Sequence, residues 1–252
     1  MELRKDIHLG FSAIDERKNG TSNHLLNFSY FNRQSRLTIP VPVFSEVLNS
    51  KILFHLSTSD YVLAEIIPRI GQYKIRLNDD AWESLFLAVV YQQLNGSVAK
   101  KIVNRIRSNF LGNLPSPDQV LENHKNILIR YGLSARKQDT LLDVAREIKN
   151  GNLDLQSFTL LSDSEVVQKL TSVRGIGPWT ANMFLVFHLG RLDVIIPNDL
   201  GLRKAIKFNY ALDELPTQSE VDKISKFWSP YRSVAAWYLW KSLPGFPEPG
   251  LS

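Results

Sequence analysis

The stretch VRGIGPWTANMF, which begins at Val173, combines residues that could hold an anion. Gly175 and Gly177 lack a Cβ, so each can adopt a positive φ and can let another molecule approach the backbone closely. Pro178 suits the first position of a following helix, because its missing N–H would have no partner there. The N–H groups of such a turn and of a helix N-terminus bind phosphate, and Arg174 would add positive charge. On this stretch alone, a tight turn that only joins two packed helices is an equal alternative.

A second candidate for chemistry is Asp199, in the segment IIPNDLGLRKAI. Two isoleucines and Pro197 precede it, and it stands at the start of an expected helix, whose dipole favours an ionised acid. A fixed carboxylate can stabilise a developing positive charge or deprotonate water. The same position suits a helix N-cap, a role that Asn198 could fill instead. On this segment alone, the cap is the favoured interpretation for Asp199.

Composition excludes several classes of protein. The chain has 252 residues, of which 44% are hydrophobic, enough for one or two domains with a sizeable core. It has no cysteine, which excludes disulfides, cysteine-bound zinc and iron–sulfur clusters, and its five histidines show no metal-ligand spacing. No apolar run approaches the roughly 18 residues of a membrane span, and no secretory signal is expected. A net charge of +5 is compatible with nucleic acid but is weak evidence for it.

Two regions must position these candidates. Residues 1–75 contain the short aromatic and β-rich runs LLNFSYF, RLTIPVPVF and KILFHL, which predict a small N-terminal β-containing (α+β) domain. Residues 76–252 show helical periodicity, which predicts a mainly α body. Asn78 or Asp79 could cap the helix AWESLFLAVVYQQ, and capping boxes are expected at Ser116–Gln119, Ser162–Glu165 and Thr217–Glu220.

The run from hairpin to carboxylate, LTSVRGIGPWTANMFLVFHLGRLDVIIPNDLGLRKAI, resembles the helix-hairpin-helix superfamily of DNA glycosylases. It looks most like the 3-methyladenine DNA glycosylase II branch, which excises alkylated bases. That pattern has a Gly-x-Gly hairpin, a Trp-Thr-Ala-Asn run, and an Asp after a Pro-x pair. YQQLNGSVAKKI, YGLSARKQDTLLDVAREI and PYRSVAAWYLW also resemble family segments. The resemblance covers residues 80–242, about two thirds of the chain, and implies a helix-hairpin-helix glycosylase fold with an active-site cleft.

The resemblance implies that Asp199 is the catalytic carboxylate. Cleavage of an N-glycosidic bond passes through an oxocarbenium-like transition state, which a carboxylate stabilises. Bifunctional relatives carry a lysine two residues after the second hairpin glycine, where this chain has Trp179. Without an amine there, a monofunctional glycosylase that leaves an abasic site is expected. Arg232, in the closing helix, could pair with a carboxylate or with a DNA phosphate.

The resemblance also implies residues that reach and read the base. Such enzymes flip the target base out of the duplex and fill the gap with a wedge residue, here Gln93 or Leu94. Trp179 and Trp240 match aromatic positions around the base pocket, and Met183 stands where a relative has a stacking Tyr. An aromatic cleft would select a cationic alkylated purine. The alternative for Leu94 and for each Trp is ordinary core packing.

The sequence thus predicts a monofunctional DNA glycosylase for alkylated bases in base-excision repair. A non-catalytic helix-hairpin-helix DNA-binding module is the first alternative, since it would keep Gly175 and Gly177 without needing Asp199. A bifunctional glycosylase/lyase is the second, and Trp179 disfavours it. The expected partner is double-stranded DNA carrying damaged bases, with no membrane and a monomeric protein. No cofactor or metal is expected, except a monovalent cation that could sit at the hairpin; action in the cytoplasm, at the nucleoid, or in a nucleus is expected.

Overall fold

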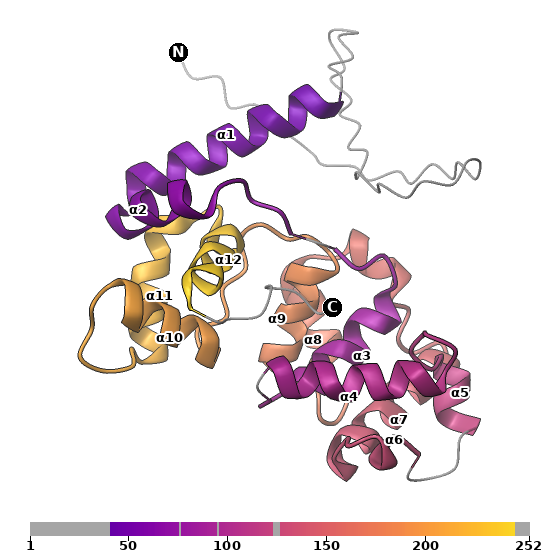
Figure 1. The fold of residues 1–252 in the computed structure, drawn as a ribbon. Coiled ribbons are helices and arrows are strands. Elements are labelled where there is room, and N and C mark those ends of the chain that lie inside the picture. Colours follow the sequence, from indigo (N-terminus) through magenta and orange to yellow (C-terminus); the bar gives the residue numbers. More distant parts are fainter. Residues whose placement is uncertain (1–40, 76, 95, 123–126, 245–252) are drawn as a thin grey trace, which may run out of the picture. The chain divides into compact units, whose positions relative to one another are not determined.

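The computed structural model describes residues 41–75, 77–94, 96–122 and 127–244 (Figure 1). The chain divides into two compact units, Met1–Leu53 and Phe54–Ser252. Residues 54–75 therefore belong to the same unit as the helical body, whereas the sequence places a boundary near residue 75. No helix within the described ranges is long and apolar enough to cross a membrane.

The described residues form α-helices and two short 3-10 helices, without a strand. The helices are α1 Val41–Ser59, α2 Tyr61–Ile70, α3 Ala81–Tyr91, α4 Gly96–Asn109, α5 Pro117–Glu122, α6 Ile127–Arg130, α7 Ala135–Lys149, η1 Gln156–Leu160, α8 Asp163–Thr171, α9 Pro178–Phe187, α10 Leu200–Asn209, α11 Gln218–Ser225, η2 Lys226–Trp228 and α12 Arg232–Ser242. The expected helical body is confirmed.

The expected β structure near the N-terminus is wrong where the structure describes it. The run KILFHL, residues 51–56, lies within α1, as does the end of the RLTIPVPVF run. Ile52 and Leu56 are buried, whereas Phe54 is 72% exposed. A strand would place all three on one face, and only the helical period separates Phe54 from the other two. The LLNFSYF run lies outside the described residues.

The expected capping boxes predict the starts of three helices, α5, α8 and α11. The capping boxes at Ser162–Glu165 and Thr217–Glu220 both form, and Ser116 and Gln119 exchange the equivalent two hydrogen bonds. The cap of α3 is Asp80, whose Oδ1 accepts the Glu83 N–H at 2.8 Å, rather than Asn78 or Asp79. The Asn78 side chain instead accepts the Asp80 N–H, so the capping residue is the one after Asp79.

The core sits around three apolar helices. Most residues of α3, α9 and α12 are buried on all sides, as expected for helices enclosed by others. α3 packs against α4, α7 and α9, while α12 packs against α2 and α10 (Figure 1). Asp60, the N-cap of α2, accepts hydrogen bonds from Tyr210 Oη and from Trp228 Nε1, which ties α2 to the end of α10 and to η2. These contacts fix the helices that carry the candidate site.

Candidate active site

Asp199 stands at the N-terminus of α10 and is its N-cap. Its Oδ1 accepts the Leu202 backbone N–H at 2.6 Å, which satisfies one of the free donors of the first turn. Asn198, the alternative cap, is exposed and does not fill this role. The cap and the candidate catalytic carboxylate are therefore the same side chain.

Two tryptophans hold the Asp199 carboxylate from other helices. Trp179, in the first turn of α9, donates its indole N–H to Oδ2 at 2.9 Å. Trp240, near the end of α12, donates its indole N–H to Oδ1, also at 2.9 Å. Each carboxylate oxygen thus accepts at least one fixed N–H, and the group has a defined orientation at a half-buried position.

The Trp-Thr-Ala-Asn run of α9 reaches three different parts of the structure. Trp179 bonds to Asp199, as described above. The Thr180 hydroxyl accepts a hydrogen bond from Gln92 Nε2 at 2.9 Å. Asn182 donates to the Ile195 carbonyl at 3.3 Å, in the segment that leads to Asp199. The run therefore connects the hairpin helix to the carboxylate and to the turn after α3.

Asp193 and α12 fix the approach to Asp199. Arg232 donates Nε to Asp193 Oδ1 at 2.7 Å and Nη2 to Oδ2 at 3.0 Å, and Ser229 donates to the same carboxylate. Partial burial alone would raise the pKa of Asp193, but the hydrogen bonds from Arg232 and Ser229 outweigh it and the pKa is lowered. The Ser233 hydroxyl adds hydrogen bonds to both backbone groups of Val194. Arg232 thus pairs with a carboxylate, which resolves the choice that the sequence left open.

The structure requires glycine at one of the two hairpin positions but not at the other. Gly175 has a φ of 89°, and a Cβ there would lie 1.9 Å from the Thr140 hydroxyl oxygen of α7. Gly177 has a φ of −103°, an extended backbone that any residue can adopt, and a Cβ there would meet open space. Positive φ is therefore required at Gly175 but not at Gly177.

The N-terminus of α9 is open. Gly177 is the N-cap and offers no side chain to cap the helix, while Pro178 occupies the first turn. The remaining N–H groups of this turn are therefore oriented outward, as in helix termini that bind phosphate. Arg174 beside them is 77% exposed and is paired with Asp143 at 2.9 Å. The cation expected at this hairpin stays a prediction.

The turn after α3 carries the two wedge candidates. Gln92 is the C-cap of α3 and points inward, donating to the Gly175 carbonyl at 3.0 Å and to Thr180. Gln93 is exposed and has a φ of 55°, whereas Leu94 is half-buried. The wedge role of Gln93 or Leu94 stays a prediction.

The expected base-pocket residues gather on α9 and α12. Met183 lies four residues after Trp179 on α9 and is 9% exposed. Trp240 is 3% exposed, and its ring lies 5.9 Å from that of Phe187. Their burial also satisfies the core-packing interpretation, so the roles of Trp179, Met183 and Trp240 in a base pocket stay predictions.

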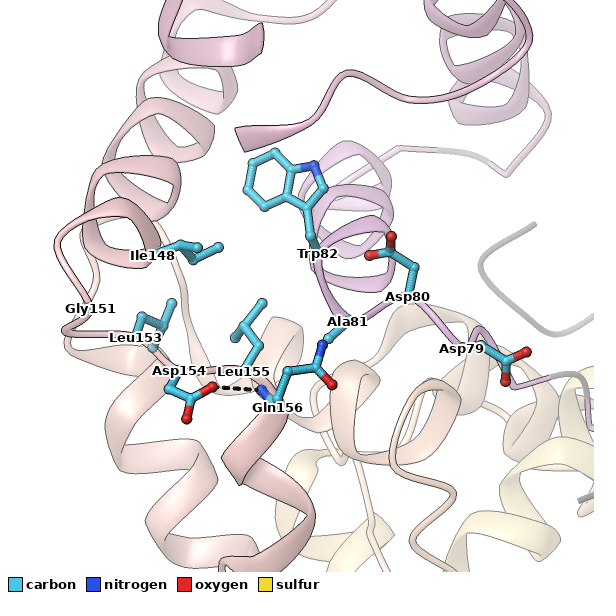
Figure 2. Close-up of a pocket in the computed structure, with 10 residues that line it drawn as sticks. All are labelled: Asp79, Asp80, Ala81, Trp82, Ile148, Gly151, Leu153, Asp154, Leu155 and Gln156. Carbon is cyan, nitrogen blue, oxygen red and sulfur yellow. Dashed lines mark hydrogen bonds between the residues drawn. The ribbon is translucent and has the colours of Figure 1, made fainter. Parts of the chain in front are cut away.

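A separate pocket lies at the other end of α3, and no predicted site residue lines it (Figure 2). Its volume is about 720 Å3, and it is lined by Asp79, Asp80, Ala81, Trp82, Ile148, Gly151, Leu153, Asp154, Leu155 and Gln156. Three aspartates line it, at Asp79, Asp80 and Asp154, and no basic side chain does. Carboxylates repel a phosphate backbone, so this pocket does not suit DNA.

Sequence reasoning missed three residues that support this region. Asp193 pairs with Arg232, and the sequence does not single it out. The sequence also singles out neither Gln92, in the segment YQQLNGSVAKKI, nor Thr140. Their partners lie between 35 and 88 residues away in the chain, so the local sequence contains no pattern that identifies them.

Comparisons with known proteins show the family of this chain. Residues 86–230 match the family described as HhH-GPD superfamily base excision DNA repair protein. The chain is 33% identical over 213 residues to DNA-3-methyladenine glycosylase 1 of Schizosaccharomyces pombe, covering 82% of this chain and 93% of that relative.

Solved structures give the same result. A 3-methyladenine DNA glycosylase from Schizosaccharomyces pombe, in complex with abasic DNA, matches with a TM-score of 0.72 and 34% identity, over 76% of this chain and 95% of that one. A DNA-3-methyladenine glycosidase from Bacillus halodurans matches with a TM-score of 0.65 and 32% identity, over 80% and 93%. The chain therefore belongs to the HhH-GPD superfamily of base excision DNA repair proteins.

Proposed function

We propose that this protein is a monofunctional DNA glycosylase that flips out and excises alkylated bases, such as 3-methyladenine, in base-excision repair. The observation that carries the proposal is the Asp199 carboxylate, held by two indole N–H groups and one backbone N–H. Relatives named as DNA-3-methyladenine glycosylases supply the substrate class. A non-catalytic DNA-binding module could use Asp199 as a helix cap but would not need the two indole donors that orient its carboxylate.

Asp199 acts on the sugar of the flipped nucleotide. As the N-glycosidic bond breaks, positive charge develops on the sugar, and a carboxylate fixed nearby stabilises it electrostatically. The same carboxylate orients or deprotonates the water that attacks the sugar carbon. Because Trp179, Trp240 and Leu202 already fix the group, little reorganisation is needed during the reaction.

Trp179 supports hydrolysis without strand cleavage. Strand cleavage by relatives with a lysine at this position requires an amine that attacks the sugar. Here the residue is a tryptophan whose only donor is bonded to Asp199. The product is therefore an intact strand with an abasic site.

The DNA duplex binds at the open end of α9. The uncapped N-terminus of α9 and the exposed Arg174 bind one phosphate, without reading the sequence. The turn at Gln93 and Leu94 then fills the gap that the flipped base leaves. Trp179, Met183 and Trp240 form the side of the base pocket next to Asp199, and the protein acts as a monomer.

Release of free bases from a panel of duplexes tests the proposal. The panel holds single lesions, including 3-methyladenine, 7-methylguanine, 1-methyladenine and hypoxanthine, with an undamaged duplex as control. We expect release of at least one alkylated base and an alkali-sensitive abasic site, with no adduct after borohydride treatment. A trapped covalent adduct in high yield would contradict the monofunctional assignment, and binding without release from any lesion would favour the non-catalytic module.

A further inference from the structure

The Gly-Leu-Ser-x-x-Lys segment places Lys137 in the first turn of α7. A cation is unfavourable there, because the helix dipole is positive at its N-terminus. Its side chain instead reaches the other end of a neighbouring helix, where Nζ donates to the Val90 and Gln92 carbonyls, each at 2.8 Å. These carbonyls belong to the C-terminal end of α3, where the dipole favours a cation.

Lys137 completes the hydrogen bonding of the α3 C-terminus. The carbonyls of a helix's last turn have no partner within the helix. At the end of α3, the Val89 carbonyl accepts the Gln92 N–H and the Tyr91 carbonyl accepts the Leu94 N–H. Lys137 donates to the two remaining carbonyls, those of Val90 and Gln92. The backbone from Val89 to Leu94 is therefore held by hydrogen bonds at four successive carbonyls.

The Gln92 side chain fixes the same turn to the hairpin. Its Nε2 donates to the Gly175 carbonyl and to the Thr180 hydroxyl, at 3.0 and 2.9 Å. Directly after Gln92, which is held by its carbonyl and by its side chain, Gln93 adopts a φ of 55°, which non-glycine residues rarely adopt. Such a conformation persists only where its surroundings impose it, and strain of this kind gathers at functional sites.

The position of Lys137 is unfavourable by itself. Burial lowers its pKa to about 8, because the ammonium has lost part of its hydration. A desolvated charge is tolerated where hydrogen bonds replace the lost water. Two backbone carbonyls of one turn provide these bonds. The structural role of Lys137 is therefore to hold this turn rather than to fill space in the core.

We propose that Lys137 is a positioning residue, which holds the Gln92–Leu94 turn in the conformation that enters the DNA base stack. This rests on the proposed function, since it requires a protein that flips a base. Lys137 itself need not touch DNA. It acts through the α3 carbonyls, whereas the phosphate is bound by other groups, the N–H groups at the start of α9.

Three variants test this role. Lys137→Met keeps most of the length of the side chain but removes all donors, and Lys137→Arg keeps charge and donors. Lys149→Met is the matched control, because it removes the same charge from an exposed position near the other end of α7. Base flipping is followed by the fluorescence of 2-aminopurine next to the lesion, alongside single-turnover release and binding to undamaged duplex.

We expect Lys137→Met to lower the fluorescence change and the release rate by about tenfold or more, the effect of losing hydrogen bonds to a charged group. Its affinity for undamaged duplex should stay within about twofold of Lys149→Met, and Lys137→Arg should recover most of the flipping. Flipping by Lys137→Met equal to that of Lys149→Met would overturn the proposal. An equal loss of flipping and of undamaged-duplex affinity would also overturn it, because that pattern indicates general unfolding of the region.

The test separates this proposal from the catalytic one. Fluorescence is also recorded in an Asp199→Asn background, where flipping should persist although release is lost. If the wild type flips a base but releases none, the catalytic assignment fails and the role of Lys137 is still measured. If the wild type produces no fluorescence change, the turn does not insert and the role of Lys137 is refuted. Should Lys137→Met not fold, Lys137→Gln replaces it. The proposal then requires that Lys137→Gln loses flipping relative to Lys149→Met and keeps its affinity for undamaged duplex.

Discussion

The N-termini of α9 and α10 solve one problem in opposite ways. Each helix begins with free N–H groups that favour a negative partner. At α10 the partner comes from the chain itself, since the Asp199 carboxylate caps Leu202 and is held by two indoles. At α9 the cap is Gly177, which has no side chain to offer. One helix start therefore presents an anion, and the other is suited to receive one.

The N-termini of α10 and α9 therefore have different roles. The start of α10 is built from three helices and fixes the orientation of a reacting group. The start of α9 is left open, and only an external phosphate would complete it. Variants at each start should consequently affect different measurements.

The largest effect is expected for Asp199→Asn. Asn remains a good helix cap, so the fold should be kept. However, the charge is lost, and the side-chain amide would turn an N–H towards donors that need an acceptor. We expect single-turnover base release to fall by about 100-fold to 1,000-fold or more, with DNA binding kept or tightened. Asp154→Asn, far from the site, controls for the change in charge, and a variant at Asp199 that kept most of its rate would refute the assignment.

The next effect concerns the folding role of the hairpin. Gly175→Ala would place a Cβ 1.9 Å from the Thr140 hydroxyl oxygen at a φ of 89°. We expect its free energy of unfolding to fall by about 2 kcal/mol or more, because the backbone or α7 must shift. Gly177→Ala, which meets open space, should be close to wild type in denaturant titrations. Equal destabilisation of both variants would erase the distinction between the two glycines.

Gly177→Val tests the role of the open N-terminus of α9. A φ of −103° suits valine and its Cβ meets open space, so the variant should fold, with only the small loss of melting temperature expected of a poorer N-cap. The added bulk should lower DNA affinity by about tenfold, equally on damaged and undamaged duplexes, because phosphate contacts do not read sequence. If the folded variant bound DNA as tightly as wild type across a salt titration, the turn would only join two helices.

Arg174→Ala should have a smaller effect on the same surface. Arg174 and Arg146 both pair with Asp143, but only Arg174 belongs to the hairpin. We expect Arg174→Ala to reduce the slope of log affinity against log salt by about 0.9, the value for one phosphate contact, whereas Arg146→Ala leaves it nearly unchanged. Equal slopes for the two variants would remove Arg174 from the phosphate site.

The smallest effect is a pH dependence on the α10 side. The lowered pKa of Asp193 means that its ionised form stabilises the fold above the ordinary value of 3.8. As pH falls through the lowered pKa, this contribution is lost. The difference in free energy of unfolding between wild type and Asp193→Asn should therefore shrink in acid, and Arg232→Met should converge in the same way. A difference that stayed constant from neutral pH to acid would show that the ion pair contributes no pH-dependent stability.

Features governed by neighbouring residues could be predicted from the sequence. The capping boxes at Ser162–Glu165 and Thr217–Glu220 form because donor and acceptor lie three residues apart. The start of α9 at Pro178 follows from the fixed φ of proline. The strand predicted for KILFHL was wrong because six residues are too few for their hydrophobic period to distinguish a helix from a strand.

The arrangement around Asp199 was only partly predictable. The resemblance singled out Asp199, Trp179 and Trp240, but it assigned the two indoles to a base pocket. Their hydrogen bonds to the carboxylate span 20 and 41 residues and depend on how α9, α10 and α12 pack. Long-range packing of this kind has no local sequence pattern, so only the structure reveals that these indoles orient the acid.

The hydrogen bond from Trp240 to Asp199 has a consequence for the newly made chain. Ribosomes synthesise Asp199 41 residues before Trp240, a delay of roughly 2–8 s at common elongation rates. Until α12 emerges and docks, the carboxylate lacks one of its donors and the Asp193 loop lacks Arg232. An unfinished chain therefore contains the whole hairpin before it contains the last donor to the Asp199 carboxylate.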